Sequence, residues 1–436
     1  MRAPKSQYPL LGFNSYDCWN SDMDEAKCLA NIAAFVKRLK PFGYEYFCID
    51  AGWYLDEYFC ERAKMSSADL HAIVDDFGRP QASKRKFPHG IKFISDTCHK
   101  NGIKFGIHQM RGIPVEALTK ETTIKGTGYK VADIVDKDNV CSWSTRYYGV
   151  DMTKPGAQEY YDSIVEYFDE NGVDFIKLDD VAEQPDEIEA FSKAIEKASR
   201  PIVLSLSPGN FVNLHLVPVY SKYADMVRIT GDIWDRPSDL EAAFERWEHW
   251  QESGDKNFWL DLDMVPFGIL QCDAPPAQPG RKPAGPGPLL PPAKHPSDLT
   301  LLEKRTFITQ RALSASPIFF GGELTLSPDE DISLVTNPTV LACNRNGICA
   351  KRVVGERLID IRVAPSKDNP NHGWFGVFNR RPERPHRYSI SIEMLKLPPT
   401  VDLTNICDVW TQKPLIVKDG KLHFDLQPSE CRFYQY

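Results

Sequence analysis

The first three-quarters of the chain alternates short apolar segments with longer segments of helical periodicity. Eight of the apolar segments are expected to be strands: Leu11–Asn14, Tyr46–Ile49, Lys104–Ile107, Phe175–Leu178, Ile202–Leu204, Met226–Arg228, Phe258–Leu260 and Ile318–Phe320. Segments this short and this uniformly apolar are typical of parallel strands that are covered on both faces. Eight such strands are the number that closes a (β/α)8 barrel of about 250 residues, and a chain of 436 residues leaves room for insertions and a smaller domain. The sequence therefore predicts an α/β fold with a TIM barrel.

The segments between these strands carry the signals of helices. Met23–Lys40 places Ala26, Leu29, Ala33, Val36 and Leu39 on one stripe, behind a start signal at Ser21. Further helices are expected over Gly90–Asn101, Gly156–Glu170, Ser238–Glu252 with Ser238 as its N-cap, and Leu299–Ala315.

Two segments break the alternation. Asp273–Pro296 is so rich in Pro and Gly that neither a helix nor an inner strand is expected, and its position favours an insertion at the barrel rim. After Asn346, short alternating segments predict antiparallel strands: Leu358–Val363, Trp374–Asn379, Arg387–Ile392, Leu415–Val417 and Leu422–Leu426. We therefore expect a catalytic barrel over residues 1–346 and a C-terminal antiparallel β-domain over residues 347–436.

Composition restricts the partners and the compartment. The formal net charge of −8 argues against a nucleic-acid or anionic-membrane surface and suits a neutral ligand such as a sugar. No apolar stretch approaches the roughly 20 residues that span a bilayer, and the first residues lack the apolar core of a secretory signal. The 11 cysteines show no CxxC spacing, so we expect free buried thiols and neither a metal site nor a cofactor. These features predict a cytoplasmic protein, although a secreted protein whose leader had been removed would look the same. A homo-oligomer is compatible with them.

Polar side chains follow the expected strands at the points where each apolar run ends. In order along the chain these are Tyr16, Asp50, Trp53, His108, Arg111, Lys177, Asp179, Asp180, Ser205, Ser207, Arg228, Asp232, Asp261 and Asp263, with Trp143 in a connecting loop. Because the catalytic groups of TIM barrels gather at the carboxyl ends of the strands, these side chains are expected around one pocket. Aromatic rings, carboxylates and cations together suit a polyhydroxylated ring.

Each of these residues alone has a structural explanation. A single Asp at a strand end is more often a cap, Trp53 and Trp143 are more often packing residues, and a lone histidine such as His108 is more often structural. Lys177 is harder to explain in this way, because an inward lysine would be buried without a partner unless Asp179 or a ligand pairs with it. The whole set at successive strand ends favours function, with Asp179 and Asp232 as two carboxylates that could share the work of cleaving a glycosidic bond.

Two alternatives stay open at this point. Asp50, Asp179, Asp180, Asp261 and Asp263 could ligate Mg²⁺ in a barrel lyase or isomerase. The barrel could also bind sugars without catalysis, although the presence of both acids counts against this.

Several stretches in the right order resemble glycoside hydrolase family 27, the α-galactosidases and melibiases. They are GFNSYDCW, GYEYFCIDAGW, KFPHGIKFISDTCHKNGIKFGIH, GVDFIKLDD, RITGDIWD, FWLDLDM and PIFFGGELTLSPDEDISLVTNPTVLACNRN, and the loop IHQMRGIP looks like one subgroup of that family. The resemblance implies a retaining hydrolase of terminal α-D-galactosyl residues and a C-terminal β-sandwich. It makes Asp179 the nucleophile and Asp232 the general acid/base. It also implies that Lys177, Arg228, Asp50 and Asp263 bind sugar hydroxyls or support the acid's loop, with Tyr16 where the family usually has Trp under the sugar.

Departures from the family pattern bear on the sugar. Asp50 is followed by Ala51 where the galactosidases commonly have a second Asp, His108 replaces the usual Tyr, and the fifth loop reads Leu-Ser-Pro-Gly. These departures are compatible with β-L-arabinopyranosides or α-glucans as substrates. The retaining mechanism implies carboxyl groups about 5–5.5 Å apart, with Asp179 kept ionised by Lys177 and Asp232 kept protonated through burial and neighbouring carboxylates.

Overall fold

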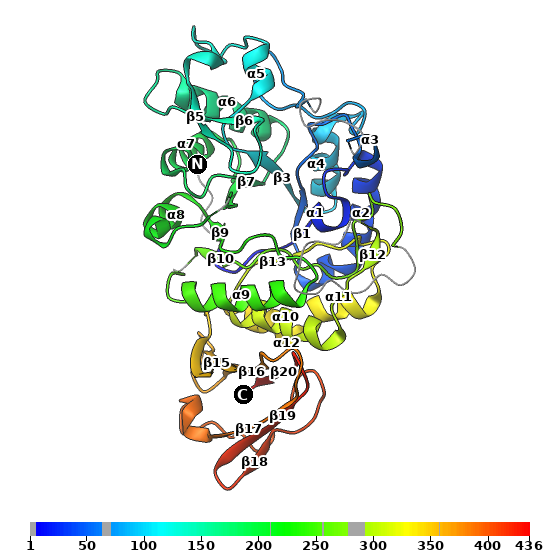
Figure 1. Ribbon diagram of the computed structural model, residues 1–436, viewed down its shortest axis with the longest axis vertical. Helices are drawn as coiled ribbons and strands as arrows, with labels where there is room; N and C mark the ends of the chain where they lie inside the picture. Colours follow the sequence, from blue (N-terminus) through cyan, green and yellow to red (C-terminus); the bar gives the residue numbers. More distant parts are fainter. Residues whose placement is uncertain (1–5, 63–70, 210, 255–256, 278–292, 357) are drawn as a thin grey trace.

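The structure is a computed structural model that describes residues 6–62, 71–209, 211–254, 257–277, 293–356 and 358–436. It consists of a barrel with surrounding helices and a β-domain at one side, with α9, α10 and α12 between the two (Figure 1). None of the helices in the described ranges combines the length and the apolar character that a bilayer crossing requires.

The barrel is an eight-stranded parallel sheet in the order β10-β9-β8-β7-β3-β2-β1-β13. Its strands are β1 Leu11–Asn14, β2 Tyr46–Ile49, β3 Lys104–Met110, β7 Phe175–Asp179, β8 Val203–Leu206, β9 Met226–Arg228, β10 Trp259–Asp261 and β13 Ile318–Phe320. The prediction of eight strands and of a TIM barrel is confirmed, with shifts of one to three residues at some boundaries.

The edges of the sheet, β10 and β13, are joined by the residues that follow β10. The Val265 N–H donates to the Phe319 carbonyl at 2.8 Å, and the Gly321 N–H donates to the Val265 carbonyl at 3.0 Å. The cylinder therefore has one seam where irregular backbone replaces a regular strand pair.

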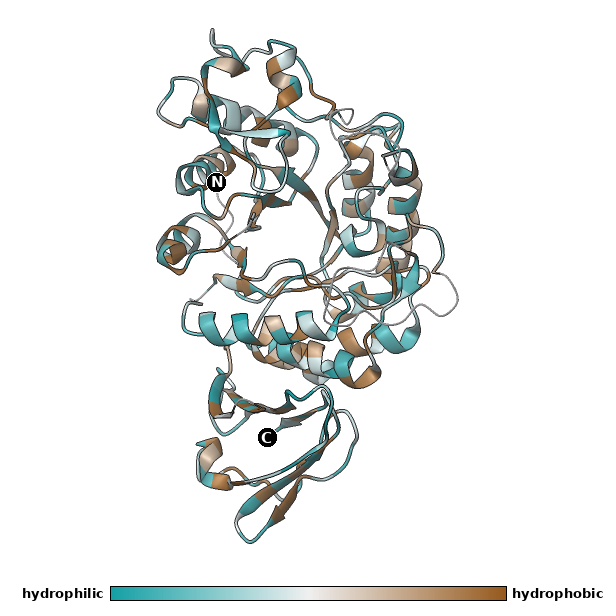
Figure 2. Ribbon diagram, viewed as in Figure 1, coloured by the Kyte–Doolittle hydropathy of each residue, from teal (hydrophilic) through white to brown (hydrophobic). Residues whose placement is uncertain are grey.

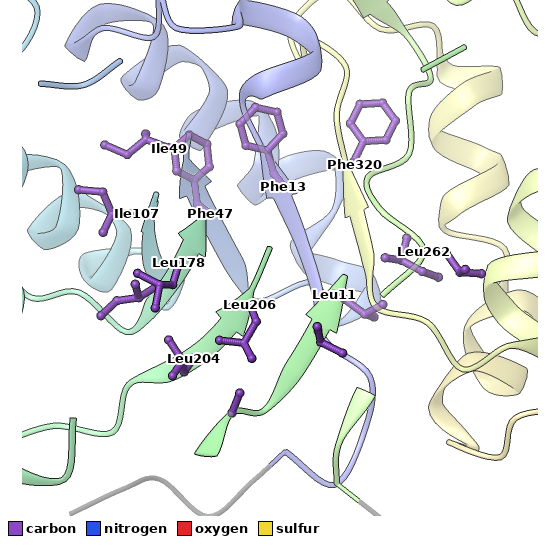
Figure 3. Close-up of a cluster of buried hydrophobic side chains, with 14 of the residues drawn as sticks. Leu11, Phe13, Phe47, Ile49, Ile107, Leu178, Leu204, Leu206, Leu262 and Phe320 are labelled. Atoms are coloured by element: carbon purple, nitrogen blue, oxygen red, sulfur yellow. The ribbon is translucent and has the colours of Figure 1, made fainter. Parts of the chain in front are cut away.

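Successive residues of each strand point to opposite sides of the barrel wall. Phe13 and Phe47 point toward the outer helices and stack with ring centroids 4.9 Å apart (Figure 3). Cys48, Phe175 and Phe319 belong to a separate cluster inside the barrel. Because the alternation continues to the strand ends, residues such as Asp50 and Asp179 fall on the inward-facing positions.

Helices cover the outside of the barrel and carry both hydrophobic and hydrophilic residues (Figure 2). The longer ones are α2 Glu25–Arg38, α4 Gly90–Lys100, α6 Ala157–Glu170, α7 Pro185–Lys197, α8 Val217–Tyr223, α9 Pro237–Trp250, α10 Leu301–Leu313, α11 Asp329–Val335 and α12 Pro338–Arg345, and the shorter ones are α1 Tyr16–Trp19, α3 Phe59–Arg62 and α5 Val115–Thr119.

The N-terminal signals predicted for two helices, Ser21 and Ser238, are wrong. The side chain of Asp24, and not that of Ser21, caps α2 by accepting the Lys27 N–H at 3.0 Å. Helix α9 begins at Pro237, so Ser238 lies inside the first turn and is not the N-cap. In α10 the Thr300 side chain and Glu303 form a capping box, which fixes the start of the helix two residues after the predicted one.

A small antiparallel sheet lies between β3 and β7 and was not expected from the sequence. It has the order β4-β6-β5 and consists of β4 Ile113–Pro114, β5 Val135–Val140 and β6 Tyr147–Val150. Figure 1 shows it on the side of the barrel away from the C-terminal domain. At the base of the Pro/Gly-rich insertion, β11 Ile269–Leu270 pairs with β12 His295–Pro296. Residues 278–292 of that insertion lie outside the described residues.

The C-terminal domain consists of two antiparallel sheets, which confirms the predicted β-sandwich. One sheet contains β14 Lys351–Glu356, β15 Ile359–Pro365, β16 Gly373–Asn379 and β20 Cys431–Gln435, and the other contains β17 His386–Ser391, β19 Lys421–Leu426 and β18 Ile416–Lys418. Ile361, Phe375 and Phe424 fill the core between them. Strands β14 and β20 are additional to the predicted set.

The β14–β20 sheet also packs against the barrel. Phe378 makes an edge contact with Phe244 of α9 at 5.0 Å, and the Arg362 guanidinium lies 3.7 Å from the ring centroid of Trp247. Phe378 and Phe433 belong to the same buried cluster as the barrel strands and helices. The two units therefore share a hydrophobic core.

Candidate active site

A pocket of about 320 Å³ opens at the carboxyl ends of the barrel strands. Most of the predicted site residues line it: Tyr16, Asp50, His108, Trp143, Lys177, Asp179, Arg228, Asp232 and Asp263. They come from loops and strands that are far apart in the sequence and that the closed sheet brings to one end. Asp179 and Asp232 therefore face the same cavity.

Asp50 and Lys177 form a buried ion pair at the floor of the pocket. Lys177 Nζ lies 2.7 Å from Asp50 Oδ2, which also accepts a hydrogen bond from Asn14 Nδ2 at 2.8 Å. Burial alone would raise the pKa of Asp50, but the charges of Lys177 and His108 hold that pKa well below its ordinary value. Burial alone would likewise lower the pKa of Lys177, and Asp50 raises it instead. Lys177 therefore has Asp50, and not Asp179, as its direct partner.

Asp179 has its own cationic surroundings. His108 Nε2 lies 3.2 Å from Asp179 Oδ2, and the Asp180 N–H donates to Asp179 Oδ1 at 2.8 Å. Burial would raise the pKa of Asp179, but the hydrogen bond from His108 and the charges of His108, Lys177 and Arg228 together lower it. The site thus keeps this carboxylate ionised, as a nucleophile requires.

Asp232 lies at the mouth of the pocket. Arg228 Nη1 is 2.9 Å from Asp232 Oδ1 and 3.1 Å from Asp263 Oδ2, so one guanidinium nitrogen serves both carboxylates. The side chain of Asp232 is 66% exposed, so the expectation that this residue is buried is wrong. Asp263 also accepts the Ile233 N–H at 2.8 Å, which fixes the loop beside Asp232.

Trp53, Arg111 and Ser205 lie outside the lining of the pocket. Trp53 is buried behind the wall and donates its indole N–H to the His108 carbonyl at 2.8 Å. Arg111 is also buried and pairs with Asp180 at 2.9 Å and Glu187 at 3.0 Å. Ser205 lines a smaller cavity inside the barrel, below the pocket. Trp53 thus supports His108, and Arg111 supports the residue that follows Asp179.

Ala51, which the sequence analysis singled out, also lines the pocket, together with residues that it did not: Asp17, Pro208, Gly209, Gly231, Ile233, Trp234 and Met264. Trp234 stands two residues after Asp232 and lies 6.3 Å from the Tyr16 ring, so proximity to a predicted acid was the available signal. Asp17 is buried, its Oδ2 has no hydrogen-bond partner among the described residues, and burial raises its pKa well above the ordinary value. Burial therefore favours the protonated form of this carboxyl group at the pocket edge.

The five acids proposed for a magnesium site have other partners. Asp50, Asp179, Asp180 and Asp263 pair with Lys177, His108, Arg111 and Arg228, respectively, and Asp261 accepts the Asp263 N–H at 2.8 Å. In the part of the chain that the structure describes, the side chains spaced closely enough to hold a metal ion are a different set, Asp235, His295 and Asp298. That set ties the end of the insertion to the loop after β9, because His295 Nε2 and the Asp298 N–H both contact Asp235 Oδ2, at 3.1 and 2.6 Å. The donor groups in the pocket therefore do not fit a magnesium centre.

Comparisons with known proteins agree with this geometry. No family model matches the chain. Two solved structures of a glycoside hydrolase family 27 β-L-arabinopyranosidase from Geobacillus stearothermophilus are 31% and 32% identical to it, with TM-scores of 0.87 and 0.86. Each alignment covers 99% of this chain, and 97% and 96% of the two solved chains. The chain belongs to glycoside hydrolase family 27.

Curated family relatives extend the comparison at lower identity. Alpha-galactosidase A of Cellvibrio japonicus is 24% identical over 82% of this chain and 72% of its own length. The alpha-galactosidase of Cyamopsis tetragonoloba is 21% identical over 98% of this chain and 86% of its own length. As a member of family 27 the protein is a glycoside hydrolase with a carbohydrate substrate, which argues against the lyase and the non-catalytic alternatives.

Proposed function

We propose that the protein removes a terminal galactose-configured residue, in the first place α-D-galactosyl, from glycosides with retention of configuration. The observation that carries this proposal is the placement of two carboxylates with different exposure in one pocket. Asp179 lies inside the pocket beside His108, whereas Asp232 pairs with Arg228 and stands at the solvent-exposed mouth. The names of the α-galactosidase relatives support the choice of sugar.

Two displacement steps account for the reaction. The Asp179 carboxylate attacks the anomeric carbon as the bond to the leaving oxygen breaks, and Asp232 donates its proton to that oxygen. Asp232 then takes a proton from water, the water oxygen bonds to the anomeric carbon, and the bond to Asp179 breaks. Lys177 and Asp50 at the floor, with Arg228 and Asp263 at the side, are placed to bind the sugar hydroxyls.

A panel of p-nitrophenyl glycosides tests the proposal. We expect the α-galactoside to release p-nitrophenol faster than the α-glucoside or the α-N-acetylgalactosaminide. Asp179→Ala should abolish turnover while the protein stays folded, and added azide should restore it with a product of inverted configuration. A fully active Asp179→Asn variant would refute the nucleophile assignment.

A second candidate is the hydrolysis of β-L-arabinopyranosides, which are galactose-configured but lack the exocyclic CH₂OH. Ala51 favours it, because this lining residue presents a methyl group where a second carboxylate would hold the hydroxyl of that substituent. The arabinopyranosidase structures, similar over nearly the whole chain, also support it. If this candidate is correct, p-nitrophenyl β-L-arabinopyranoside is the faster substrate and Ala51→Asp shifts the preference toward the α-galactoside.

We also propose that catalysis is confined to residues 1–346 and that the protein works in a reducing compartment. In support of the first point, every residue that lines the pocket precedes Asn346. In support of the second, all 11 cysteines are free thiols and most of them are buried. Titration of the thiols in denaturant without a reductant should count all of them, and a lower count would contradict the second point.

A further inference from the structure

The lining of the pocket changes from buried to exposed between its floor and its mouth. Asp50 and His108 at the floor are 2% and 1% exposed. At the mouth, the Asp232 side chain is 66% exposed and Trp143 is 54% exposed. Because Asp232 must reach the leaving oxygen, the sugar that is released first lies at the mouth, beside the exposed indole.

Trp143 stands on a loop that is fixed in place. The loop connects β5 to β6, and Ser142 donates to Asp180 Oδ1 from its backbone N–H at 3.2 Å and from its hydroxyl at 2.5 Å. Asp180 directly follows the proposed nucleophile and is held by Arg111 at 2.9 Å. The position of the indole is therefore coupled to that of Asp179.

Neighbouring backbone both supports this loop and leaves room for a ligand. A Cβ added at Gly209 would overlap Asp180 Oδ1 and Ser142 Oγ, so the loop after β8 abuts the Trp143 loop closely. Gly231 precedes Asp232 in the lining, and no atom of the described residues lies within 4 Å of a Cβ added there. The mouth is thus walled on the Trp143 side and open on the Asp232 side.

We propose that Trp143 is the platform of a binding subsite for the leaving group, and that the preferred substrates carry a second pyranose or an aryl ring in that position. The inference rests on the proposed function, because it uses Asp232 as the acid. A flat ring face stacks on an aromatic face through dispersion and removes apolar area from water. Because the loop is already anchored, an exposed tryptophan on it offers such a face with little further ordering of the backbone at binding.

Three probes with the same galactosyl group and different leaving groups test the inference: α-galactosyl fluoride, p-nitrophenyl α-galactoside and melibiose. Fluoride is a single atom that cannot stack, p-nitrophenol offers an aryl ring, and melibiose releases glucose. We expect Trp143→Ala to lower the ratio of kcat/KM for melibiose to kcat/KM for the fluoride about tenfold, mainly through KM. Trp143→Phe should restore most of the ratio, and p-nitrophenyl galactoside should follow melibiose.

Phe42→Ala is the matched control, because Phe42 is also an exposed aromatic residue, 42% exposed, and lies outside the pocket lining. It should leave the ratio as in the wild type. If the panel selects the arabinopyranosyl group, its fluoride and its p-nitrophenyl glycoside take the place of the galactosyl probes. A ratio that is unchanged in both Trp143 variants would overturn the subsite. A wild-type protein that hydrolyses none of the probes would instead overturn the proposed function.

Discussion

At the scale of single residues, the pocket is a set of polar pairs that join different strands and the loops that follow them. Asp50 forms an ion pair with Lys177 and Asp263 with Arg228, and His108 Nε2 contacts Asp179. These contacts tie the ends of the barrel strands to one another around the pocket. Removing one partner of a pair is therefore expected to lower both the stability of the fold and the catalytic activity.

Lys177→Met should show this coupling. The change leaves the Asp50 carboxylate buried without its cation, and breaking a buried pair costs about 3–5 kcal/mol of unfolding free energy. Adding Asp50→Asn to Lys177→Met should recover a large part of the stability and none of the activity. Urea denaturation and steady-state kinetics on the three proteins separate the two effects. Equal stability of the wild type and Lys177→Met would contradict the pairing.

Asp261 gives the stability a dependence on pH. Burial, followed by the charge of Asp263, raises the pKa of Asp261 to about 7. Between about pH 4 and pH 7 the folded protein holds a proton here that the unfolded chain has lost, so stability falls as the pH rises through this window. Asp261→Asn should remove that slope and raise the unfolding free energy at pH 8 by about 1–2 kcal/mol, a value reduced for the solvent contact of this partly buried side chain.

Denaturant titrations of Asp261→Asn and the wild type at pH 4.5, 6 and 8 measure this slope. The two proteins should be close in stability at pH 4.5, where the carboxyl group is protonated in the folded state. A gap that is the same at all three pH values would argue against titration of Asp261.

Residue types and strand ends in the sequence were enough to predict most residues that line the pocket. They did not predict which of these residues form ion pairs with one another. Asp179, two residues along the same strand, or a ligand was expected to pair with Lys177, whereas its partner Asp50 directly follows β2. Trp53 and Arg111 follow strands and Ser205 lies within β8, yet all three point behind or below the pocket. Which side chains turn into the cavity depends on loop geometry that no local pattern contains.

At the scale of secondary structure, strands with a clear apolar pattern were predictable and irregular ones were not. All eight barrel strands are apolar runs, and their inward positions follow from the alternation along each strand. The sequence of β5, Val-Asp-Lys-Asp-Asn-Val, has no such run, and its strand exists because β6 pairs with it. The sheet that presents Trp143 was therefore outside the reach of sequence patterns.

Gly112 lies between β3 of the barrel and β4 of the small sheet, where the backbone passes close to β6. Its φ is +76°, and an added Cβ would overlap the Tyr148 carbonyl of β6. Gly126 has nearly the same φ, +77°, and within the described part of the chain no atom lies within 4 Å of an added Cβ. Both Gly→Ala changes carry the backbone penalty of about 1–2 kcal/mol, and only Gly112→Ala adds the overlap. We expect the thermal midpoint to fall clearly further for Gly112→Ala than for Gly126→Ala, and equal shifts would count against the close approach.

At the scale of the whole molecule, the barrel and the β-sandwich are joined through α9 and α10. Phe378 of the sandwich packs against Phe244 of α9, and Trp410 donates its indole N–H to Thr309 of α10 at 2.9 Å. Arg380 and Glu241 add an ion pair across the same boundary. Composition and strand patterns indicated two units. They did not indicate the shared core, because it depends on which surfaces of the two folded units come into contact.

Because of this shared core, the two units should unfold together. Differential scanning calorimetry of the wild type is expected to give one transition. Phe378→Ala should destabilise the protein by about 3–5 kcal/mol, as for a buried aromatic residue, and lower the melting temperature without splitting the transition. Two separate transitions in the wild type would show that the interface does not couple the units.

The β11–β12 pair has a consequence for engineering. The segment between Leu270 and His295 has its two ends clamped side by side, since Leu270 pairs with His295 and Ile269 with Pro296. A loop whose ends already meet can be lengthened at an entropic cost that grows only with the logarithm of its length. A carbohydrate-binding module inserted into this segment should therefore leave every strand pair of the cylinder in place.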